Sequence, residues 1–346
     1  MAIMKVVHIL NTGKFSGAEN VVIQIIEGLR EKNDMQFVYM SLDGTIREVL
    51  QKRNIEFYLV DKISVHTIKK MVRDLKPDIL HCHDYTTSIL ASISTNKRII
   101  SHLHNNSPWI KKYGLYSWVY WASSIKYTDI LLVSETIANE YVFSKFVSKK
   151  FSVIGNPIDT RLITTQSKEF VVEKKYDIAY LGRLTEQKNP LLFIQIIKKL
   201  KAENPTISAC MIGDGDLYED VKRTICIEKL DDTIQLLGFQ KNPYPFLQKS
   251  RILLATSKWE GYGLFAVEAL VLGKPVVCTN VGGLKNIINS SCGYICDSTE
   301  EMVKRCSELL NNKELYADKA SGTKIRVKEF ITKEQYMKSI LEVYEK

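Results

Sequence analysis

Two glutamates that flank a pair of glycines are the residues whose types and spacing most clearly suggest chemistry. Glu260 and Glu268 are separated by seven residues, which include Gly261 and Gly263, and an apolar, strand-like segment precedes them. A strand, a glycine turn and a helix in this order leave backbone N–H groups unpaired at the positive end of the helix, which suits a phosphate. Carboxylates bind phosphate poorly but accept hydrogen bonds from sugar hydroxyls. The stretch therefore predicts a site for a ligand that carries both groups.

Two cations stand in a second loop with a similar setting. Arg183 and Lys188 follow another apolar segment, and Pro190 then starts a helix. An arginine fork with a lysine point charge could neutralise a diphosphate without a metal, although an ordinary exposed loop is the alternative. Gly213 and Gly215, after the next expected strand, allow a close backbone approach that could border a nucleoside base.

The histidines are all confined to the first third of the chain, before residue 105. Two pairs, His81 with His83 and His102 with His104, end apolar strands, and alternate positions on a strand share a face. A four-histidine metal site is conceivable, but no acidic residues at ligand spacing accompany it, so polar strand-end positions are the favoured interpretation. A neutral imidazole there could position or deprotonate an attacking hydroxyl. Gly17 lies in a further strand-to-helix loop that could cradle a phosphate.

The elements that must position these residues alternate along the 346 residues as short apolar segments and helical patterns. This alternation predicts two α/β domains with parallel sheets, covering residues 1–160 and 161–330, with a final helix after them. A weakly patterned polar segment that ends near residue 175 separates the two. Strands are expected at 5–10, 36–40, 56–60, 78–83, 98–104, 129–134, 176–182, 207–212, 233–237, 252–256, 275–279 and 293–296. The helices most clearly indicated are 18–30, 65–75, 86–94, 115–127 and 333–346.

Composition bounds the partners and the compartment. The net charge of +9 is diffuse, which suits anionic substrates or an anionic membrane surface and equally suits no particular partner. No nucleic-acid motif accompanies it. Seven scattered cysteines without zinc-site spacing predict reduced, buried thiols, and no signal peptide or membrane-spanning run of about 18 apolar residues is found. A cytoplasmic protein is expected. The aromatic and basic segments 109–121 and 143–151 predict either peripheral membrane contact or a helix packed on the core.

Taken in order, these motifs resemble the retaining glycosyltransferases of the GT-B fold, specifically glycosyltransferase family 4 (glycosyl transferases group 1). The resemblance implies two Rossmann-like, doubly wound domains facing across a cleft. The first would bind the acceptor, the second the nucleotide-sugar donor, and the helix at 331–346 would return to the first domain. The motifs that carry it are Ser16-Gly-Ala-Glu19, Asp78-Ile-Leu-His-Cys-His83, His102-Leu-His104, Ile154-Gly-Asn-Pro-Ile-Asp159, Gly182-Arg-Leu-Thr-Glu-Gln-Lys188, Gly213-Asp-Gly215, Leu237-Gly238, Glu260-Gly-Tyr-Gly-Leu-Phe-Ala-Val-Glu268, Pro275-Val-Val277 and Val281-Gly-Gly283.

The resemblance also implies a role for each candidate residue. Arg183 and Lys188 would grip the donor diphosphate, and Glu268 would accept hydrogen bonds from the ribose. Glu260 would hold the transferred sugar. His104 would stand beside the reacting centre, with His102 as its nearby rival. The backbone contacts to the donor would come from Gly17, Gly213, Gly215, Gly261, Gly263 and Leu264.

Ser16 and Pro157 stand where the family often has glycine. The first departure loosens the phosphate-loop assignment, and the second affects only a linker turn. The function implied is retaining, metal-independent transfer from a UDP-sugar to a hydroxyl of a glycan or lipid-linked acceptor in bacterial surface polysaccharide synthesis. No cofactor, metal or nucleic acid is expected. The alternatives are a nucleotide-sugar epimerase on the same fold and a non-catalytic, two-domain sugar-binding protein.

Overall fold

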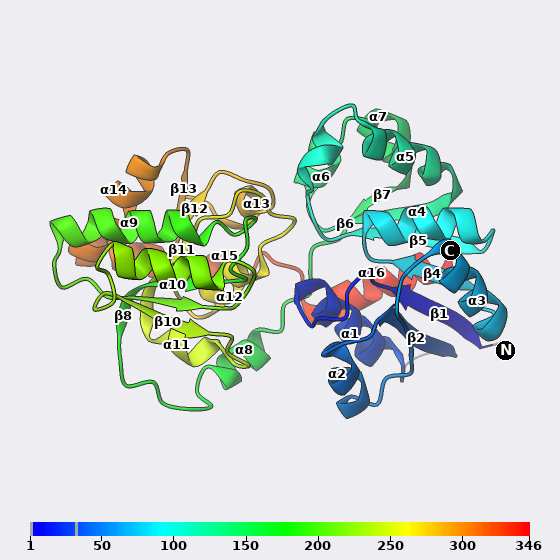
Figure 1. The fold of residues 1–346 in the computed structure, drawn as a ribbon, viewed down its shortest axis with the longest axis horizontal. Coiled ribbons are helices and arrows are strands. Elements are labelled where there is room, and N and C mark those ends of the chain that lie inside the picture. The colour runs from blue at the N-terminus through cyan, green and yellow to red at the C-terminus, as the bar shows by residue number, and fades with distance from the viewer. Residues whose placement is uncertain (1–2, 32–33) are drawn as a thin grey trace. The chain divides into compact units, whose positions relative to one another are not determined.

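The chain folds into two units that each carry one parallel sheet (Figure 1). The computed structural model describes residues 3–31 and 34–346. One unit comprises Met1–Pro157 together with Ile331–Lys346, and the other comprises Ile158–Phe330. The backbone therefore leaves the first unit after Pro157 and re-enters it at Ile331.

The first unit has strands and helices in alternation, and its last helix comes from the end of the chain. Short 3₁₀ turns at Pro108–Lys111, Ser124–Lys126 and Ser148–Lys150 connect some of them. The elements are β1 (Met4–Ile9), α1 (Gly17–Leu29), β2 (Met35–Leu42), α2 (Ile46–Lys52), β3 (Phe57–Val60), α3 (Val65–Leu75), β4 (Ile79–Cys82), α4 (Tyr85–Ser94), β5 (Arg98–Leu103), α5 (Leu115–Ser123), β6 (Tyr127–Leu132), α6 (Glu135–Glu140), α7 (Ser144–Val147), β7 (Phe151–Val153) and α16 (Lys333–Glu345).

The second unit repeats the alternation with six strands. Its elements are α8 (Thr160–Gln166), β8 (Tyr176–Leu181), α9 (Pro190–Glu203), β9 (Ala209–Ile212), α10 (Tyr218–Ile227), β10 (Ile234–Gly238), α11 (Tyr244–Gln248), β11 (Ser250–Ala255), α12 (Leu264–Val271), β12 (Val276–Thr279), α13 (Leu284–Ile287), β13 (Gly293–Cys296), α14 (Thr299–Asn311) and α15 (Lys313–Val327).

Strand order shows where each sheet can bind a ligand. The first sheet runs β3-β2-β1-β4-β5-β6-β7 and the second β10-β9-β8-β11-β12-β13, with every pair parallel. The order reverses between β1 and β4 in one sheet and between β8 and β11 in the other. In open parallel sheets ligands bind at the carboxyl ends of the strands at such a switch point. The expectation of two doubly wound α/β domains is confirmed.

Alternating burial on the strands builds a core on each face of the second sheet. On β11, Ile252 and Leu254 pack into one cluster with α9, α10 and α14, whereas Leu253 and Ala255 pack into another with α12 and α13. This is the period of two that a strand buried on both faces requires. Both faces are apolar, so the polar residues of interest are left to the strand ends.

The terminal helix α16 is part of the first unit. Arg98 donates to the backbone carbonyls of Tyr344, at 2.7 Å, and of Val343. The Lys346 ammonium lies 3.0 Å from the Asp129 carboxylate. Figure 1 shows α16 in red among the blue elements near the N-terminus. These bonds tie the last residues to β5 and β6.

The aromatic segment departs from its prediction. The helix expected over 115–127 ends at Ser123, and Ser124–Lys126 forms a 3₁₀ turn. The helical spacing of aromatic residues from Trp109 to Tyr120 does not lie on one helix, because Trp109 belongs to a 3₁₀ turn that Pro108 opens and Gly114 caps a separate helix. Among the cysteines, all are free and only Cys226 is exposed.

Candidate functional site

An ion pair forms at the switch point of the second unit, where the loops after β8 and β11 meet. Lys188, from the first loop, places its Nζ 2.5 Å from Oε1 of Glu260, from the second. The hydroxyl of Ser257 donates to the same oxygen at 2.7 Å. Only 14% of the lysine side chain and 6% of the glutamate side chain are exposed. Because so little of either side chain is exposed to solvent, the ion pair holds both groups in fixed positions before any ligand binds.

Hydrogen bonds to backbone carbonyls join the same two loops. The Lys258 N–H donates to the Gln187 carbonyl at 2.7 Å, and the Gln187 amide donates to the Trp259 carbonyl at 3.1 Å. Thr256 donates from its hydroxyl to the Lys188 carbonyl at 3.1 Å. These hydrogen bonds fix the two loops relative to each other, and so they hold the backbone that carries Lys188 and Glu260 in place.

The start of α12 leaves donors open beside this pair. Gly263 caps the helix with φ of 102°, a left-handed conformation that favours glycine. The N–H groups of Leu264 and Phe265 have no acceptor in the part of the chain that the structure describes. The Lys188 ammonium lies 4.0 Å from the centroid of the Phe265 ring. A helix N-terminus with an adjacent cation is a site for an anion.

Glu268 lies one turn into the same helix and has a raised pKa. Its Oε1 accepts a hydrogen bond from the Tyr244 hydroxyl at 3.2 Å. Burial raises the pKa of Glu268 to about 7, although that hydrogen bond and the Lys188 charge oppose the rise. The carboxyl group is thus a hydrogen-bond acceptor above neutral pH and a donor below it.

The remaining predicted residues of the second unit line the carboxyl ends of β8 and β9. Gly213 has φ of 146°, and a Cβ there would lie 1.9 Å from the Gly182 carbonyl oxygen, so only glycine fits this approach. A Cβ on Gly215 would lie 2.5 Å from the Leu184 carbonyl oxygen. The Arg183 side chain is exposed and forms no ion pair within the described residues. It is the one strong cation of the loop that is free to reach a ligand.

The structure thus brings one set of predicted residues together in the second unit, in two neighbouring places. Lys188, Glu260, Gly261, Gly263, Leu264 and Glu268 gather where β11 meets α12, and Arg183, Gly213 and Gly215 border the ends of β8 and β9. Gly17 and His104 belong to the first unit. Gly17 is the exposed first residue of α1, and His104 follows β5.

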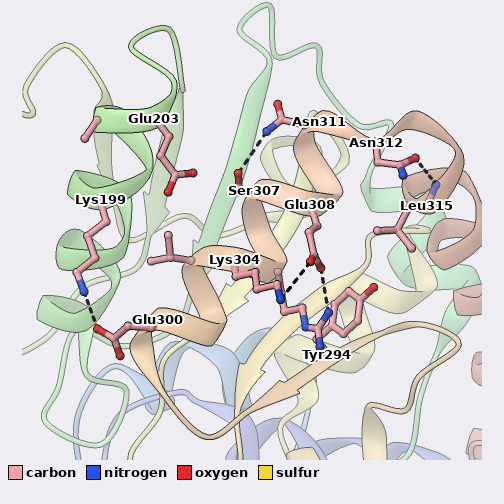
Figure 2. A pocket seen from close by; sticks show the side chains of 13 residues that line it. Lys199, Glu203, Tyr294, Glu300, Lys304, Ser307, Glu308, Asn311, Asn312 and Leu315 are labelled. Atoms are coloured by element: carbon pink, nitrogen blue, oxygen red, sulfur yellow. Dashed lines mark hydrogen bonds and ion pairs between the residues drawn. The ribbon is translucent and has the colours of Figure 1, made fainter.

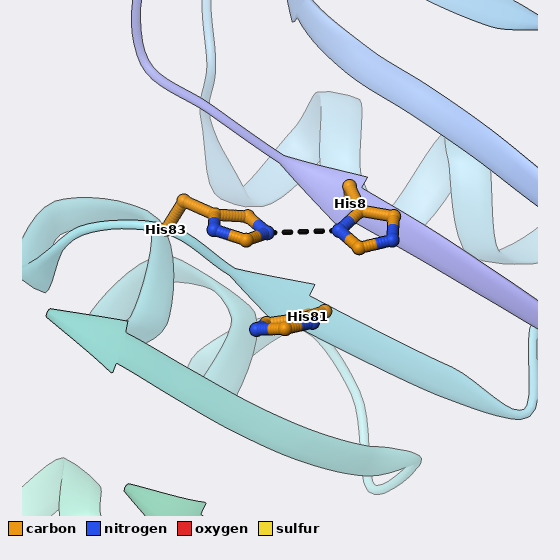
Figure 3. A group of neighbouring side chains, drawn as sticks. All are labelled: His8, His81 and His83. Atoms are coloured by element: carbon orange, nitrogen blue, oxygen red, sulfur yellow. Dashed lines mark hydrogen bonds between the residues drawn. The ribbon is translucent and has the colours of Figure 1, made fainter. Parts of the chain in front are cut away.

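Five histidines cluster at the ends of three neighbouring strands in the first unit. His8 on β1 is paired in register with His81 on β4, and the Nδ1 of His8 lies 2.8 Å from the Nε2 of His83 (Figure 3). His83 Nδ1 is 3.0 Å from His104 Nε2. Burial lowers the pKa of His104 to about 3, so its ring is neutral at physiological pH.

The first of two possible metal-ligand triplets among these rings is poorly arranged for a metal. Two triplets have ligand nitrogens within 4.8 Å of one another, namely His8, His81 and His83, and His83, His102 and His104. A ring nitrogen, however, binds a metal in the plane of its ring. The His81 and His83 rings are stacked at 25° with centroids 4.2 Å apart, so their lone pairs lie in nearly parallel planes and do not converge.

A broad hollow elsewhere in the second unit contains none of the predicted residues (Figure 2). It measures about 1210 Å³ and lies between α9 and α14. Several of the charged side chains that line it already pair with one another, because Lys199 pairs with Glu300 at 2.8 Å and Arg305 with Glu308 at 3.0 Å. The converging donors at α12 are therefore the better candidate site.

Sequence reasoning missed five residues that complete these clusters. Ser257 lies just before the Glu260–Glu268 motif and Phe265 lies inside it, but neither carries a signal of its own. Tyr244 reaches Glu268 from a separate helix. His8 lies near the end of the first strand, as the two histidine pairs do on theirs, so the sequence could have indicated that it belongs to the same cluster. Tyr344 lies on the last helix, and nothing in the sequence indicated that it would join the cluster.

Comparison with known proteins identifies both halves. Residues 15–162 match the family model "Glycosyltransferase Family 4", and residues 163–325 match "Glycosyl transferases group 1". A glycosyltransferase of Methanocaldococcus jannaschii, described as uncharacterized, is 31% identical over 238 residues, which are 62% of this chain and 58% of the relative. The UDP-Gal:alpha-D-GlcNAc-diphosphoundecaprenol alpha-1,3-galactosyltransferase of Escherichia coli is 25% identical over 326 residues, covering 85% of this chain and 84% of the relative.

Solved structures agree on the fold. HepE of Anabaena, in complex with UDP and glucose, superposes with a TM-score of 0.85 over 99% of each chain at 19% identity. A similarity at this identity shows the architecture, which is GT-B with two Rossmann-like domains. With two family models that together span residues 15–325, the chain belongs to glycosyltransferase family 4 and is a sugar-transferring enzyme.

Proposed function

We propose that the protein transfers a sugar from a UDP-sugar to a hydroxyl of a glycan or lipid-linked acceptor, with retention of anomeric configuration and without a metal. One observation carries the proposal. The buried Lys188–Glu260 pair stands beside the open N-terminus of α12, with Glu268 one turn farther along that helix. Cation, free N–H groups and carboxyl groups thus occur in the combination that a nucleotide-sugar needs.

Each part of the donor has a partner in this arrangement. The diphosphate would be held by the free Arg183, by Lys188 and by the N–H groups at the start of α12. Glu268 would accept hydrogen bonds from the ribose, and Glu260 would bind the sugar hydroxyls. Because Glu260 and Phe265 already fix Lys188, little reorganisation is needed when charge develops on the departing diphosphate.

The proposed reaction needs no protein nucleophile. The bond between the sugar C1 and the diphosphate oxygen breaks, and the acceptor oxygen forms a new bond to C1 on the same face. The acceptor proton passes to a phosphate oxygen of the leaving UDP. The two cations neutralise the diphosphate in place of a metal. His104, which is neutral, would hydrogen-bond a substrate hydroxyl beside the reacting centre.

The choice of donor and acceptor rests on the relatives. The HepE structure contains UDP and glucose, and the E. coli relative is named for UDP-Gal and a diphosphoundecaprenol acceptor. Both support UDP over other nucleotides. The E. coli relative supports a lipid-linked acceptor, and a second E. coli relative, the O-antigen biosynthesis glycosyltransferase WclY, supports bacterial surface polysaccharide synthesis. The identity of the sugar is left to experiment.

An exposed aromatic surface on the first unit supports contact with a membrane. We name it the aromatic patch: Tyr113, Leu115, Tyr116, Trp118, Ile125 and Phe146. Tyr116 and Leu115 are 68% and 75% exposed on α5. Lys112, Lys145 and Lys149 are exposed in the same segments. Aromatic residues mixed with lysines suit the interface of an anionic bilayer. No helix among the described residues is long and apolar enough to cross one.

A donor screen tests the proposal directly. Purified protein is mixed with radiolabelled UDP-, GDP- and ADP-sugars and a diphosphoundecaprenol-linked saccharide, in EDTA, and both transfer and nucleotide release are measured. We expect UDP release to be coupled to transfer. NMR should show that the substituent at the sugar C1 is axial in the product, as it is in the donor. Lys188→Ala should abolish transfer, whereas Lys258→Ala, an exposed lysine of the facing loop, should not. Interconversion of the donor without an acceptor would instead indicate an epimerase, and binding without turnover a sugar-binding protein.

Vesicle sedimentation tests the aromatic patch. The protein should pellet with vesicles that contain phosphatidylglycerol and stay in solution with pure phosphatidylcholine. The double change of Tyr116 and Trp118 to alanine should abolish pelleting. Ile227→Ala removes a side chain that is 69% exposed on the second unit and is the matched control. Equal pelleting of wild type and the double variant would refute membrane contact by this surface.

A further inference from the structure

One continuous set of hydrogen-bonding contacts runs through the histidine cluster and the last helix. Every contact joins one ring nitrogen to the next ring or to a tyrosine hydroxyl, and every member is buried or partly buried. We call it the histidine chain, and its order is His104, His83, His8, Tyr344, His81 and His102.

The successive distances define the chain. They are 3.0 Å from His104 to His83, 2.8 Å from His83 to His8, 3.5 Å from His8 to the Tyr344 hydroxyl, 2.7 Å from that hydroxyl to His81, and 3.2 Å from His81 to His102. The tyrosine hydroxyl is thus the joint between two histidine segments, and its contact with His8 is the longest.

Both ends of the chain are open. The Nδ1 of His104 and the Nε2 of His102 are buried atoms with no hydrogen-bond partner among residues 3–31 and 34–346. All other ring nitrogens of the chain are used once. Burial lowers the pKa of all five histidines, so every ring is neutral.

A neutral imidazole has one N–H and one lone pair, so each ring donates on one side and accepts on the other. Because the Tyr344 O–H needs an acceptor of its own, the hydroxyl donates to one neighbouring ring and accepts from the other, and the direction of one bond then fixes the direction of all. In one direction every histidine is the Nε2–H tautomer, the His104 end is a bare Nδ1 and the His102 end is an N–H. In the other direction every histidine is the Nδ1–H tautomer and the ends exchange roles.

The first direction leaves one buried N–H unpaired at His102, at the desolvation cost of that donor. It is favoured because Nε2–H is the more stable tautomer of a free histidine side chain and the chain adds that preference five times. We propose that Tyr344 is a positioning residue, which through the histidine chain holds His104 as the Nε2–H tautomer with a bare Nδ1. His104 then offers an acceptor to a hydroxyl, of a sugar or of an ordered water. The link to catalysis rests on the proposed function, whereas the tautomers do not.

The tautomers can be read from wild-type protein labelled with ¹⁵N-histidine. Two-bond ¹⁵N–¹H spectra at pH 7 should show Nε2 protonated and Nδ1 bare in all five rings of the histidine chain. His66 is exposed and outside the chain, so it is the internal reference. A charged ring or an Nδ1–H ring within the chain would overturn the proposal, as would spectra that change when EDTA removes a bound metal.

Tyr344→Phe removes the joint while keeping the ring. His8 would then hold a buried N–H without an acceptor, and an orphaned buried donor is rarely tolerated. Reversal of the segment moves the unpaired N–H from the fully buried His8 to His104, the partly buried open end, so His8, His83 and His104 should shift toward Nδ1–H. His81 and His102 should stay Nε2–H, because His81 loses only a donor to its lone pair. Unchanged tautomers in all five rings would refute the role of Tyr344.

Tyr336→Phe is the matched control on the same helix. Tyr336 is also fully buried, and its hydroxyl has no partner among the described residues. This variant should leave all five tautomers and the transfer rate unchanged. In Tyr344→Phe we expect kcat to fall about tenfold, part of the ~100-fold or more that a positioned acid–base group supplies, with KM for the donor unchanged. Correct tautomers in a protein that transfers no sugar would refute only the proposed function.

Discussion

The raised pKa of Glu268 predicts that this residue destabilises the folded protein above neutral pH. The folded pKa is about 7, against 4.5 for the ordinary side chain, so the folded state holds its proton over a pH range in which the unfolded state has lost it. Stability is full below the unfolded pKa and is lost as pH rises through the folded pKa. Glu268→Gln replaces the carboxylate with a neutral group that still accepts from Tyr244.

The shift gives the magnitude. Each pKa unit is worth about 1.4 kcal/mol. A shift of about 2.5 units therefore lowers the free energy of unfolding, relative to a side chain that stays neutral, by about 3 kcal/mol at pH 8 and by about 1 kcal/mol at pH 5. Glu268→Gln should therefore raise the free energy of unfolding about 2 kcal/mol more at pH 8 than at pH 5.

Urea unfolding followed by circular dichroism at both pH values measures this difference. The control is Glu173→Gln, a change at an exposed loop carboxylate of the same unit, which should alter stability little at either pH. A gain from Glu268→Gln that is the same at pH 5 and pH 8 would show that the carboxyl group is ionised at both, and the reasoning from burial would fail.

Three further changes probe the same site. Lys188→Met should lower the free energy of unfolding in urea by about 3 kcal/mol, because it leaves the buried Glu260 carboxylate without its cation. The double variant Lys188→Met with Glu260→Gln should recover most of that loss. A Lys188→Met protein as stable as wild type would contradict this. Arg183→Ala should leave stability within about 0.5 kcal/mol, because the side chain is exposed, yet weaken UDP binding about tenfold in calorimetry; undiminished affinity would remove Arg183 from the site. Tyr244→Phe should raise the Glu268 pKa further in a ¹³C carboxyl titration, since a hydrogen bond to the charged form is lost, and a fall would contradict the assignment.

Local pattern was enough to predict the two sheets and the position of Glu260 and Glu268 after β11. The strand expected at 293–296 is Gly293–Cys296 in the structure, and Glu260 lies in the loop while Glu268 lies one turn into α12, as its flanking glycines indicated. These features depend on residues close together in sequence. The same local reasoning failed over 115–127, where aromatic spacing suggested a longer helix than α5.

Long-range pairings explain what the sequence could not reveal. His8 meets His81 only because β1 lies next to β4 in the strand order, and Tyr344 meets both only because α16 packs under them. Tyr244 reaches Glu268 across 24 residues through the placement of α11. None of these contacts has a spacing signal in the sequence, because they are set by topology.

The return of α16 to the first unit makes the second unit an insertion. Residues 158–330 interrupt the first unit, whose chain is completed only by its last residues. During synthesis the amino-terminal portion emerges first, yet Arg98 lacks its carbonyl acceptors and the histidine chain lacks its joint until residue 344 has been added. The order of maturation is therefore inverted relative to the order of translation. The central portion can finish folding while the one that precedes it is still waiting, and a ribosome that stops near residue 330 would release a protein whose first-made half is the incomplete one.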